Sequence, residues 1–261
     1  MRTTAIMNLK GGTGKTVTAI NLAAILARDY AQRVLLVDAD SQANLTEFVT
    51  DYLDNVMTGG FADLLSGRHA VTWVTKMRNV KLLAADETLM ALDVSAAGNG
   101  TADPMALAEF LNQNEDKFDW CIIDCPPAFS AAAMAALIAA NEVVIPMKLD
   151  AFGIRGMRNL LEQIRNMRKI NEDLELAGVL PTMFYPDPKQ KAVEDDLREG
   201  LRKARIRTFH HIRRSTKVDE MTFAQDALIY SSPKSKATLD YKQFVKDLIR
   251  IGEEGGENDG V

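Results

Sequence analysis

One glycine-rich segment near the N-terminus constrains the fold of this chain more than any other feature: residues 8–16, with the sequence NLKGGTGKT. Residues 3–7 before it are typical of a short buried strand, and residues 17–28 after it have Ile and Ala at helical spacing. Glycines let the backbone curl so that successive N–H groups point at phosphate oxygens, and a helix N-terminus adds partial positive charge. The order of strand, glycine loop and helix therefore predicts a phosphate-binding loop.

The last two residues of this loop have side chains suited to a nucleoside triphosphate. The Lys15 ammonium is predicted to reach the β- and γ-phosphates, and the Thr16 hydroxyl to ligate Mg²⁺. A plain surface turn is a poor alternative, because three glycines and two lysines stand together between a strand and a helix.

Two further apolar stretches end in aspartates, in the sequences VLLVDAD and WCIIDCPP. Continuous apolar runs are typical of parallel strands, and carboxylates at the C-terminal edge of a parallel sheet lie where ligands bind. Asp38 is placed to hold Mg²⁺ through water, and Asp124 to hold it from a second strand end. Asp40, two residues after the first strand, could orient or activate the attacking water.

Together these motifs resemble those of the ParA/MinD ATPases, and the chain is similar to the ParA/Soj-like partitioning ATPases among them. The ordinary pattern G-x-x-x-x-G-K-[ST] fails because Leu9 stands at its first glycine, whereas the early Lys10 resembles the deviant Walker A motif of that family. The sequence DADSQ resembles the family's switch I, with Ser41 in place of the usual proline, and DCPP resembles its Walker B and switch II segment.

The resemblance implies ATP and Mg²⁺ as cofactors and a dimer in which Lys10 of each subunit reaches the other subunit's nucleotide. The catalytic residues that it implies are Lys10, Lys15 and Asp40, and the metal-binding residues are Thr16, Asp38 and Asp124. The nucleotide-binding residues that it implies are Lys10, Gly11, Gly12, Thr13, Gly14, Lys15, Thr16 and Val17.

Charge is distributed unevenly along the chain, although its net value is only −5. Residues 1–150 hold 11 Lys and Arg against 18 Asp and Glu, whereas residues 151–250 hold 20 against 14. A basic half in an acidic protein indicates a polyanionic partner, with a merely solubilising basic face as the alternative. By resemblance to segments that contact non-specific DNA in ParA-type proteins, the DNA-binding residues are Arg214, Lys217, Lys234 and Lys236, and Arg213 replaces a family proline.

Strand-like and helix-like segments alternate along the rest of the chain. This pattern predicts an α/β fold with a doubly wound, mainly parallel sheet flanked by helices, which is the P-loop NTPase fold. Helices are expected over residues 17–28, 60–65, 104–113, 131–140, 153–170, 192–204 and 237–251, and later strands over residues 80–84, 143–146, 176–180 and 206–209. We expect a single P-loop ATPase domain over residues 1–251 and an acidic, disordered tail over residues 252–261.

The predicted function is that of an ATP-dependent, dimerising ATPase that binds DNA without sequence preference. It would act in the partitioning of a chromosome, a plasmid or a mobile element. The resemblance implies a ParB-like centromere-binding protein as the partner that stimulates slow hydrolysis. Two cysteines are too few for a disulfide framework, so we expect a cytoplasmic protein. The resemblance implies that it associates with the nucleoid when ATP is bound.

Three other functions are open alternatives. A MinD-like, membrane-cycling ATPase would end in a basic amphipathic helix, but here the last helix leads into an acidic tail that an anionic membrane would repel, so no membrane partner is expected. An iron–sulfur reductase would need neighbouring cysteines, whereas Cys121 and Cys125 on one strand would lie roughly 13 Å apart. A DNA-binding regulator without catalysis would not need Asp40 and Asp124.

Overall fold

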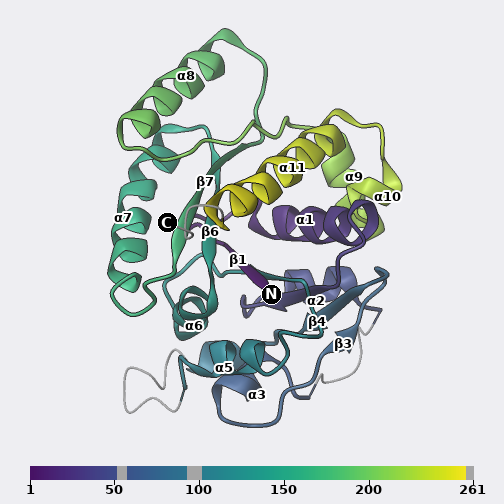
Figure 1. Ribbon diagram of the computed structural model, residues 1–261. Coiled ribbons are helices and arrows are strands. Elements are labelled where there is room, and N and C mark those ends of the chain that lie inside the picture. The colour runs from purple at the N-terminus through teal and green to yellow at the C-terminus, as the bar shows by residue number, and fades with distance from the viewer. Residues whose placement is uncertain (52–57, 93–101, 257–261) are drawn as a thin grey trace.

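The computed structural model describes residues 1–51, 58–92 and 102–256 of the chain (Figure 1). Its strands form one sheet in the order β3-β4-β2-β5-β1-β6-β7, in which every neighbouring pair is parallel except β3 and β4. The strands are β1 (Arg2–Ile6), β2 (Val34–Asp38), β3 (Trp73–Val74), β4 (Val80–Leu83), β5 (Trp120–Asp124), β6 (Glu142–Lys148) and β7 (Glu175–Thr182). The helices are α1 (Lys15–Asp29), α2 (Asn44–Val49), α3 (Phe61–Leu65), α5 (Ala106–Asn112), α6 (Ala131–Ala139), α7 (Ala151–Met167), α8 (Pro188–Lys203), α9 (Thr216–Ala224), α10 (Leu228–Ser231) and α11 (Lys236–Gly256).

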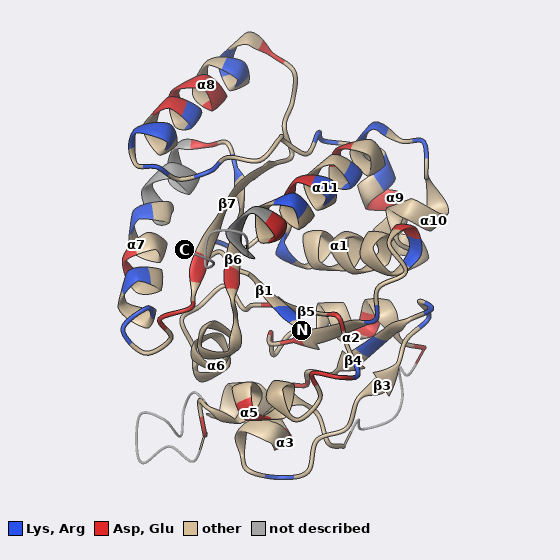
Figure 2. Cartoon of the chain, viewed as in Figure 1, with Lys and Arg blue, Asp and Glu red and all other residues tan. Residues whose placement is uncertain are grey.

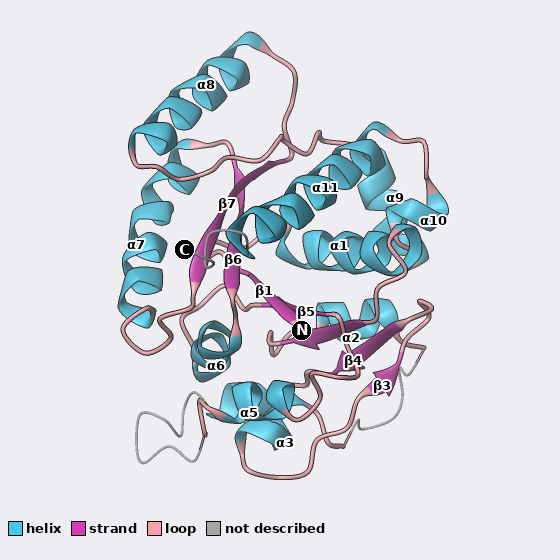
Figure 3. Cartoon of the chain, in the orientation of Figure 1, coloured by secondary structure: helices cyan, strands magenta, loops and turns pink. Residues whose placement is uncertain are grey.

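Helices cover both faces of the sheet (Figures 1 and 3). The helices α1, α2, α10 and α11 pack on one face around a core that includes Leu22, Ile122 and Phe244. The helices α3, α5, α6 and α7 pack on the other face around a core that includes Phe61 and Ile123. Successive residues of β5 thus enter opposite cores, as a strand buried on both faces requires. The predicted doubly wound, mainly parallel sheet is confirmed.

The central strands bring the predicted site residues to one edge of the sheet. β1 pairs with β5 so that Ile6 lies opposite Asp124, and β2 pairs with β5 so that Asp38 also lies opposite Asp124. The glycine loop leaves β1 at this same edge. Residues far apart in the chain therefore meet at the carboxyl ends of the strands, where open α/β sheets bind their ligands.

Most of the predicted elements are present, with boundaries shifted by a few residues. The strand expected over residues 206–209 is wrong: this segment makes a single bridge, from Val179 to Thr208, and continues as an irregular chain. The short elements β3, α2, α9 and α10 were not predicted. α11 continues to Gly256, so the first residues of the predicted tail are helical, and residues 257–261 lie outside the described part.

The last helix, α11, is amphipathic rather than apolar throughout. α11 buries Phe244 and Leu248 against the sheet and leaves Leu239 half exposed among charged residues. Among the residues that the structure describes, no helix combines the length and the apolar character needed to cross a bilayer.

Candidate nucleotide-binding site

The loop between β1 and α1 is curled as its glycines predict. Gly12 and Gly14 have φ angles of 68° and 87°, a left-handed conformation that strains residues with a side chain. Gly14 directly precedes α1, so the loop runs into a helix N-terminus. The N–H groups of that first turn have no partner within the helix and attract phosphate oxygens.

Neighbouring strands hold this loop in place through side-chain hydrogen bonds. The Asn8 amide donates to the Pro146 carbonyl of β6 at 2.7 Å, and its oxygen accepts from the Lys10 N–H at 2.9 Å. The Thr182 hydroxyl at the end of β7 donates to the Thr13 carbonyl at 2.8 Å. The loop is therefore preorganised from the β6 and β7 side of the sheet.

Thr16 and Asp124 form the part of the site that suits a metal ion. The Thr16 hydroxyl donates to Asp124 Oδ2 at 2.6 Å, whereas Asp124 Oδ1 is buried and accepts no hydrogen bond. Burial, with Asp38 nearby, raises the pKa of Asp124 well above its usual range. An unpartnered carboxylate oxygen beside a hydroxyl is a hard oxygen donor set, which fits Mg²⁺.

Asp38 supports the segment that follows β2. Its Oδ2 accepts hydrogen bonds from the N–H and the hydroxyl of Thr46, both at 2.8 Å, and its Oδ1 accepts from the Asp40 N–H at 3.1 Å. Burial raises the pKa of Asp38 to about 6, and the hydrogen bonds from Thr46 and Asp40 oppose that shift. Both of its oxygens thus position the turn that carries Asp40, and a water-mediated contact with Mg²⁺ stays a prediction.

Asp40 and Lys15 line the same cavity over the loop. Asp40 Oδ1 accepts from the Gln42 N–H at 3.1 Å, which ties the carboxylate to its own turn. Lys15 is buried, and its ammonium donates to the Lys10 carbonyl at 3.4 Å. Burial lowers the pKa of Lys15, while the carboxylate of Asp124 opposes this shift. A buried ammonium inside the glycine loop is placed to meet phosphate oxygens.

The side chain of Lys10 makes its contacts at a different place from that of Lys15. Its ammonium donates to both carboxylate oxygens of Asp150, which precedes α7, at 2.9 and 2.8 Å. The two side chains are 36% and 29% exposed, so this ion pair lies at the surface, where such pairs contribute little free energy. The lysine that the family resemblance assigns to another subunit's nucleotide is thus held within its own subunit by a weak contact.

A cavity of about 570 Å³ lies over the glycine loop. Its lining includes every predicted nucleotide-binding residue except Lys10, and it also includes Asp40 and Pro127 of the switch II segment. Thr222 and Gln225, from α9 and the residue after it, form part of the opposite wall. The structure therefore brings the first, second and third sequence motifs to one cavity.

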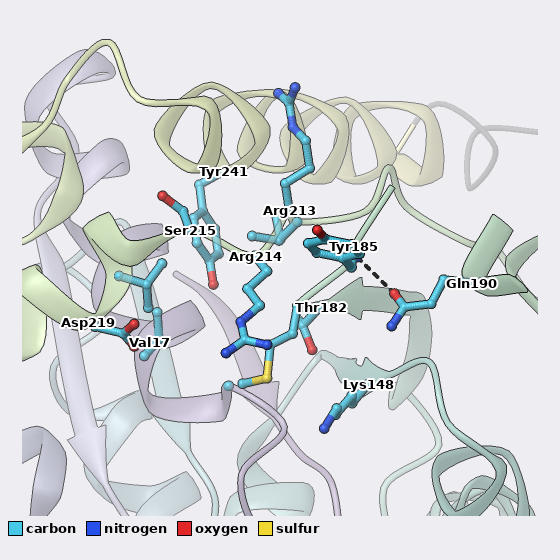
Figure 4. A pocket seen from close by; sticks show the side chains of 14 residues that line it. Val17, Lys148, Thr182, Tyr185, Gln190, Arg213, Arg214, Ser215, Asp219 and Tyr241 are labelled. Atoms are coloured by element: carbon cyan, nitrogen blue, oxygen red, sulfur yellow. Dashed lines mark hydrogen bonds between the residues drawn. The ribbon is translucent and has the colours of Figure 1, made fainter. Parts of the chain in front are cut away.

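A second cavity, of about 390 Å³, adjoins the first and shares Gly14, Val17 and Met183 with it. It lies between the end of β7, the segment before α9, and Tyr241 of α11 (Figure 4). Figure 4 shows Tyr185 and Arg214 on its walls, drawn from two different segments. Aromatic and apolar walls with a few polar groups are typical of pockets for small organic ligands. Its position beside the loop suits the nucleoside end of a nucleotide.

Cys121 and Cys125 are fully buried, and burial raises the pKa of both thiols. A buried, protonated cysteine behaves as a small apolar residue. Both cysteines are therefore residues of the core. Within the described ranges, no group of three His, Cys, Asp or Glu side chains is placed to hold a metal ion.

The predicted DNA-binding residues are exposed and lie at the N-terminal ends of two helices. Arg214 and Lys217 lie at the start of α9, and Lys234 and Lys236 at the start of α11, where Figure 2 shows basic residues. A cation at this end opposes the helix dipole, so helix stability does not explain these positions. The Lys217 ammonium is paired with Glu220 at 2.5 Å.

The sequence patterns did not reveal Asp150, Thr182 or the second cavity. Asp150 follows β6 and Thr182 ends β7, much as Asp124 ends β5, so the strand-end rule could have found both. Arg213, in the place of the family proline, pairs with Asp240 of α11 at 2.5 Å. No local pattern marks this pair, because its two residues come from separate segments.

A glycine loop that runs from β1 into α1, with Asp124 at the end of the neighbouring strand β5, defines a P-loop nucleotide-binding protein. A family model described as an AAA domain matches residues 1–176. The chromosome-partitioning ATPase Soj of Thermus thermophilus is 37% identical over 185 residues, 70% of each chain. The chromosome partitioning protein ParA of Myxococcus xanthus is 30% identical over 254 residues, 95% of this chain and 88% of that protein. The chain belongs to the ParA/Soj family of P-loop ATPases, and the resemblance is confirmed.

A solved structure from Mycobacterium smegmatis, described as cobyrinic acid a,c-diamide synthase with a bound ATP analogue and magnesium, is also similar. It has a TM-score of 0.80 and 28% identity, and the match covers 98% of this chain and 97% of that chain.

Proposed function

We propose that this protein is an ATPase that dimerises with ATP, binds DNA without sequence preference, and acts in partitioning. The observation that carries the proposal is the pair of lysines in one loop. Lys15 is buried under the phosphate cavity, whereas Lys10 is directed to Asp150 at the surface. One lysine serves the nucleotide of its own subunit, and the other can reach a second subunit's nucleotide once it leaves Asp150.

The residues of the site have different roles toward ATP. The glycine backbone and Lys15 would hold the phosphates, and Thr16 and Asp124 would hold Mg²⁺, which would supply positive charge against the phosphate oxygens. Asp40 accepts a hydrogen bond from the attacking water and orients it toward the γ-phosphate. Asp38 positions Asp40 by holding the turn between them.

The second cavity receives the nucleoside end of ATP. The exposed ring of Tyr185 offers a flat surface to a base, and the buried Tyr241 forms part of the cavity wall. The Tyr241 hydroxyl lies 3.3 Å from that of Thr18 in α1, and burial raises the pKa of Tyr241 to about 12, so the phenol stays neutral. Arg214 borders this cavity and also belongs to the predicted DNA face, so nucleotide binding and DNA contact share one residue.

Cations at the N-termini of α9 and α11 support binding to the DNA backbone. Helix N-terminal N–H groups and flexible cations both favour phosphate oxygens, and neither reads base sequence. Affinity that comes from such contacts falls steeply with salt. A titration of DNA with and without ATP across a salt series tests this: salt-independent binding, or equal binding without ATP, would contradict it.

Two variants test the dimer. Asp40→Ala is expected to bind ATP and to accumulate as a dimer, because hydrolysis no longer releases it. Lys10→Ala is expected to bind fluorescent ATP but to remain monomeric by light scattering. A monomeric Asp40→Ala protein at saturating ATP would refute the nucleotide-dependent dimer. An unchanged dimer of Lys10→Ala would refute the role of Lys10 across the interface.

The hydrolysis step is proposed to be slow until a ParB-like centromere-binding partner binds, with the ATP-bound dimer on the nucleoid and no membrane partner. The stimulation is tested by measuring the ATPase rate with DNA alone, with the partner alone and with DNA and partner together. If the partner acts on the DNA-bound dimer, the rate should rise only when DNA and partner are both present. Sedimentation with anionic vesicles tests the MinD-like alternative. Pelleting with vesicles and no binding to DNA would replace partitioning by membrane cycling.

A further inference from the structure

Four arginines line one open concavity at the C-terminal end of α8. They are Arg198, Arg202, Arg205 and Arg207, and the other lining residues are Ile206 and Thr208. The concavity measures about 430 Å³ and has no carboxylate in its lining. These four residues are called the arginine cluster below.

The nearest carboxylates on α8 do not neutralise the whole cluster. Glu194 is buried and accepts hydrogen bonds from Arg198, at 2.7 and 3.0 Å, and lies 2.9 Å from His211 Nδ1. Glu199 pairs with Lys203, which lies outside the concavity, at 2.8 Å. Arg198 is therefore anchored as a wall of the concavity, and no carboxylate of the described residues is paired with Arg202 or Arg205.

The chain leaves α8 through a turn that usually contains glycine. The Ile206 N–H donates to the Leu201 carbonyl at 2.8 Å, and the Arg205 N–H donates to the Arg202 carbonyl at 3.0 Å. These two bonds make a Schellman motif, in which the residue after the helix cap is left-handed and is most often glycine. Here that residue is Arg205, with a φ of 57°. Glycine would adopt this conformation with less strain, because it has no side chain. The need to end the helix therefore does not explain why this residue is an arginine.

Helix capping explains only part of the cluster. Cations in the last turn, such as Arg202, interact favourably with the C-terminal end of the helix dipole. Arg207 lies beyond that turn, on a segment that β7 holds: the Val179 N–H donates to the Arg207 carbonyl at 2.9 Å, and Val179 accepts from the Phe209 N–H at 2.9 Å. The cluster is therefore presented by two rigid elements.

We infer that the arginine cluster is a binding site for the phosphodiester backbone of duplex DNA, in addition to the contacts at α9 and α11; this inference rests on the proposed DNA-binding function. Guanidinium groups make paired hydrogen bonds with phosphate oxygens, and several on one concave surface match a row of phosphates. Figure 2 shows basic residues at the end of α8 and along the chain that follows it. The concavity has only Ile206 as an apolar residue, whereas membrane binding would need an apolar face to insert.

The left-handed position allows a test that does not damage the fold. Arg205→Gly is expected to keep or raise Tm, because glycine suits this φ, and to keep the ATP-dependent dimer. Its DNA affinity should fall several-fold, and the slope of log K against log salt should become shallower by roughly 0.9 for the one lost phosphate contact. The double variant Arg202→Ala/Arg205→Gly should lose about twice that slope.

The matched control is Lys203→Ala, which removes one positive charge from the same helical turn but outside the concavity. Its DNA affinity and salt slope should stay close to those of the unaltered protein. If the unaltered protein with ATP does not bind DNA, the proposed function itself fails. If it binds, and Arg205→Gly and the double variant bind equally well, the inference is wrong.

Two further outcomes would also overturn the inference. An equal loss of affinity in Lys203→Ala would mean that overall charge, rather than this site, governs binding. Sedimentation of the unaltered protein with phosphatidylglycerol vesicles, abolished in Arg205→Gly while DNA affinity is unchanged, would assign the cluster to a membrane surface.

Discussion

Lys10 and Asp150 must separate before Lys10 can reach another subunit. Their ion pair lies at the surface, where such a pair contributes about 0.2–1 kcal/mol, so breaking this ion pair alone changes an equilibrium constant by up to about fivefold.

Asp150→Asn removes the charge that holds Lys10. The ATP concentration needed for half-maximal dimerisation is expected to fall, by up to about fivefold, because the competing ion pair is lost. Light scattering during an ATP titration measures this. Arg68→Ala is the control, since it breaks the surface pair with Asp63 away from the loop. A higher ATP requirement in Asp150→Asn would show that Asp150 assists the dimer instead.

Glu194 joins α8 to the segment before α9 through His211. Arg198 of the same helix, which Glu194 holds, donates to the Phe209 carbonyl at 3.0 Å. Although burial raises the pKa of Glu194, the hydrogen bonds from His211 and Arg198 are strong enough to hold it below its usual value. A lowered folded-state pKa stabilises the protein above the unfolded value of 4.5, and this contribution is lost as the pH falls through the folded value.

Glu194→Gln should therefore destabilise the protein at neutral pH by about 1.5–3 kcal/mol, the usual contribution of hydrogen bonds to a charged group. The difference in Tm between the variant and the unaltered protein should shrink as the pH falls below 4.5. Thermal melts over a pH series measure it. A difference that persists unchanged at the lowest pH would mean that the charge of Glu194 is not its source.

At the scale of elements, β7 depends on Gly178 to accept the segment that follows α8. A Cβ at this position would lie 2.8 Å from the Arg207 carbonyl oxygen and 2.9 Å from the Phe209 ring, closer than packed atoms allow. Gly178→Ala should cost about 1–3 kcal/mol, as overpacking does, and should displace Arg207. Thermal denaturation and DNA binding measure the two effects, with Gly200→Ala on α8, where space is open, as the control.

Helices and strands with a recognisable hydrophobic pattern in their own sequence could be predicted. Those whose structure depends on packing against segments distant in the chain could not. β2 and β5 are continuous apolar runs, so periodicity alone identifies them. α9 buries only Met221 among its described residues and begins where the Ser215 side chain accepts from the Lys217 N–H at 3.2 Å. Its helical form thus depends on a cap and on packing against other elements, which periodicity does not report.

The candidate site likewise has one part that the sequence predicts and one part that it does not. Its phosphate half comes from one contiguous loop and two strand ends, each with a recognisable sequence. Its nucleoside half is assembled from β7, the segment before α9 and Tyr241 of α11, none of which has a pattern of its own. Chemistry concentrated in a short segment can be predicted from sequence, whereas a cavity formed by several packed segments cannot.

At the scale of the whole molecule, ATP in the proposed binding mode would contact both the glycine loop and the C-terminal third of the chain, so its binding should stabilise the whole protein. At 100 times its Kd a ligand adds about 2.7 kcal/mol to the free energy of unfolding. This gain should be smaller when EDTA removes Mg²⁺, because Asp124 then keeps an unpartnered buried carboxylate oxygen.

Thermal melts with ATP, in Mg²⁺ and in EDTA, measure this dependence. Asp124→Asn should reduce the difference between the two conditions, since the amide cannot serve as an anionic ligand. Thr238→Ser, at a buried hydroxyl of α11 far along the chain from the metal site, should leave the difference intact. Equal gains in Mg²⁺ and EDTA for the unaltered protein would contradict a metal role for Asp124.

The nucleotide pocket contains residues from opposite ends of the chain: Thr182 donates a hydrogen bond to the Thr13 carbonyl of the loop, and Tyr241 lines the second cavity. These residues are synthesised at different times on the ribosome. The phosphate loop is translated first, but the residues that complete its pocket follow only after about 10–45 s at typical elongation rates. A nascent chain is therefore expected to complete the proposed nucleotide pocket, and with it the proposed ability to dimerise, only after α11 has emerged. Stalled chains that end before α11 should gain no protease resistance from ATP, and resistance there would disprove this order of events.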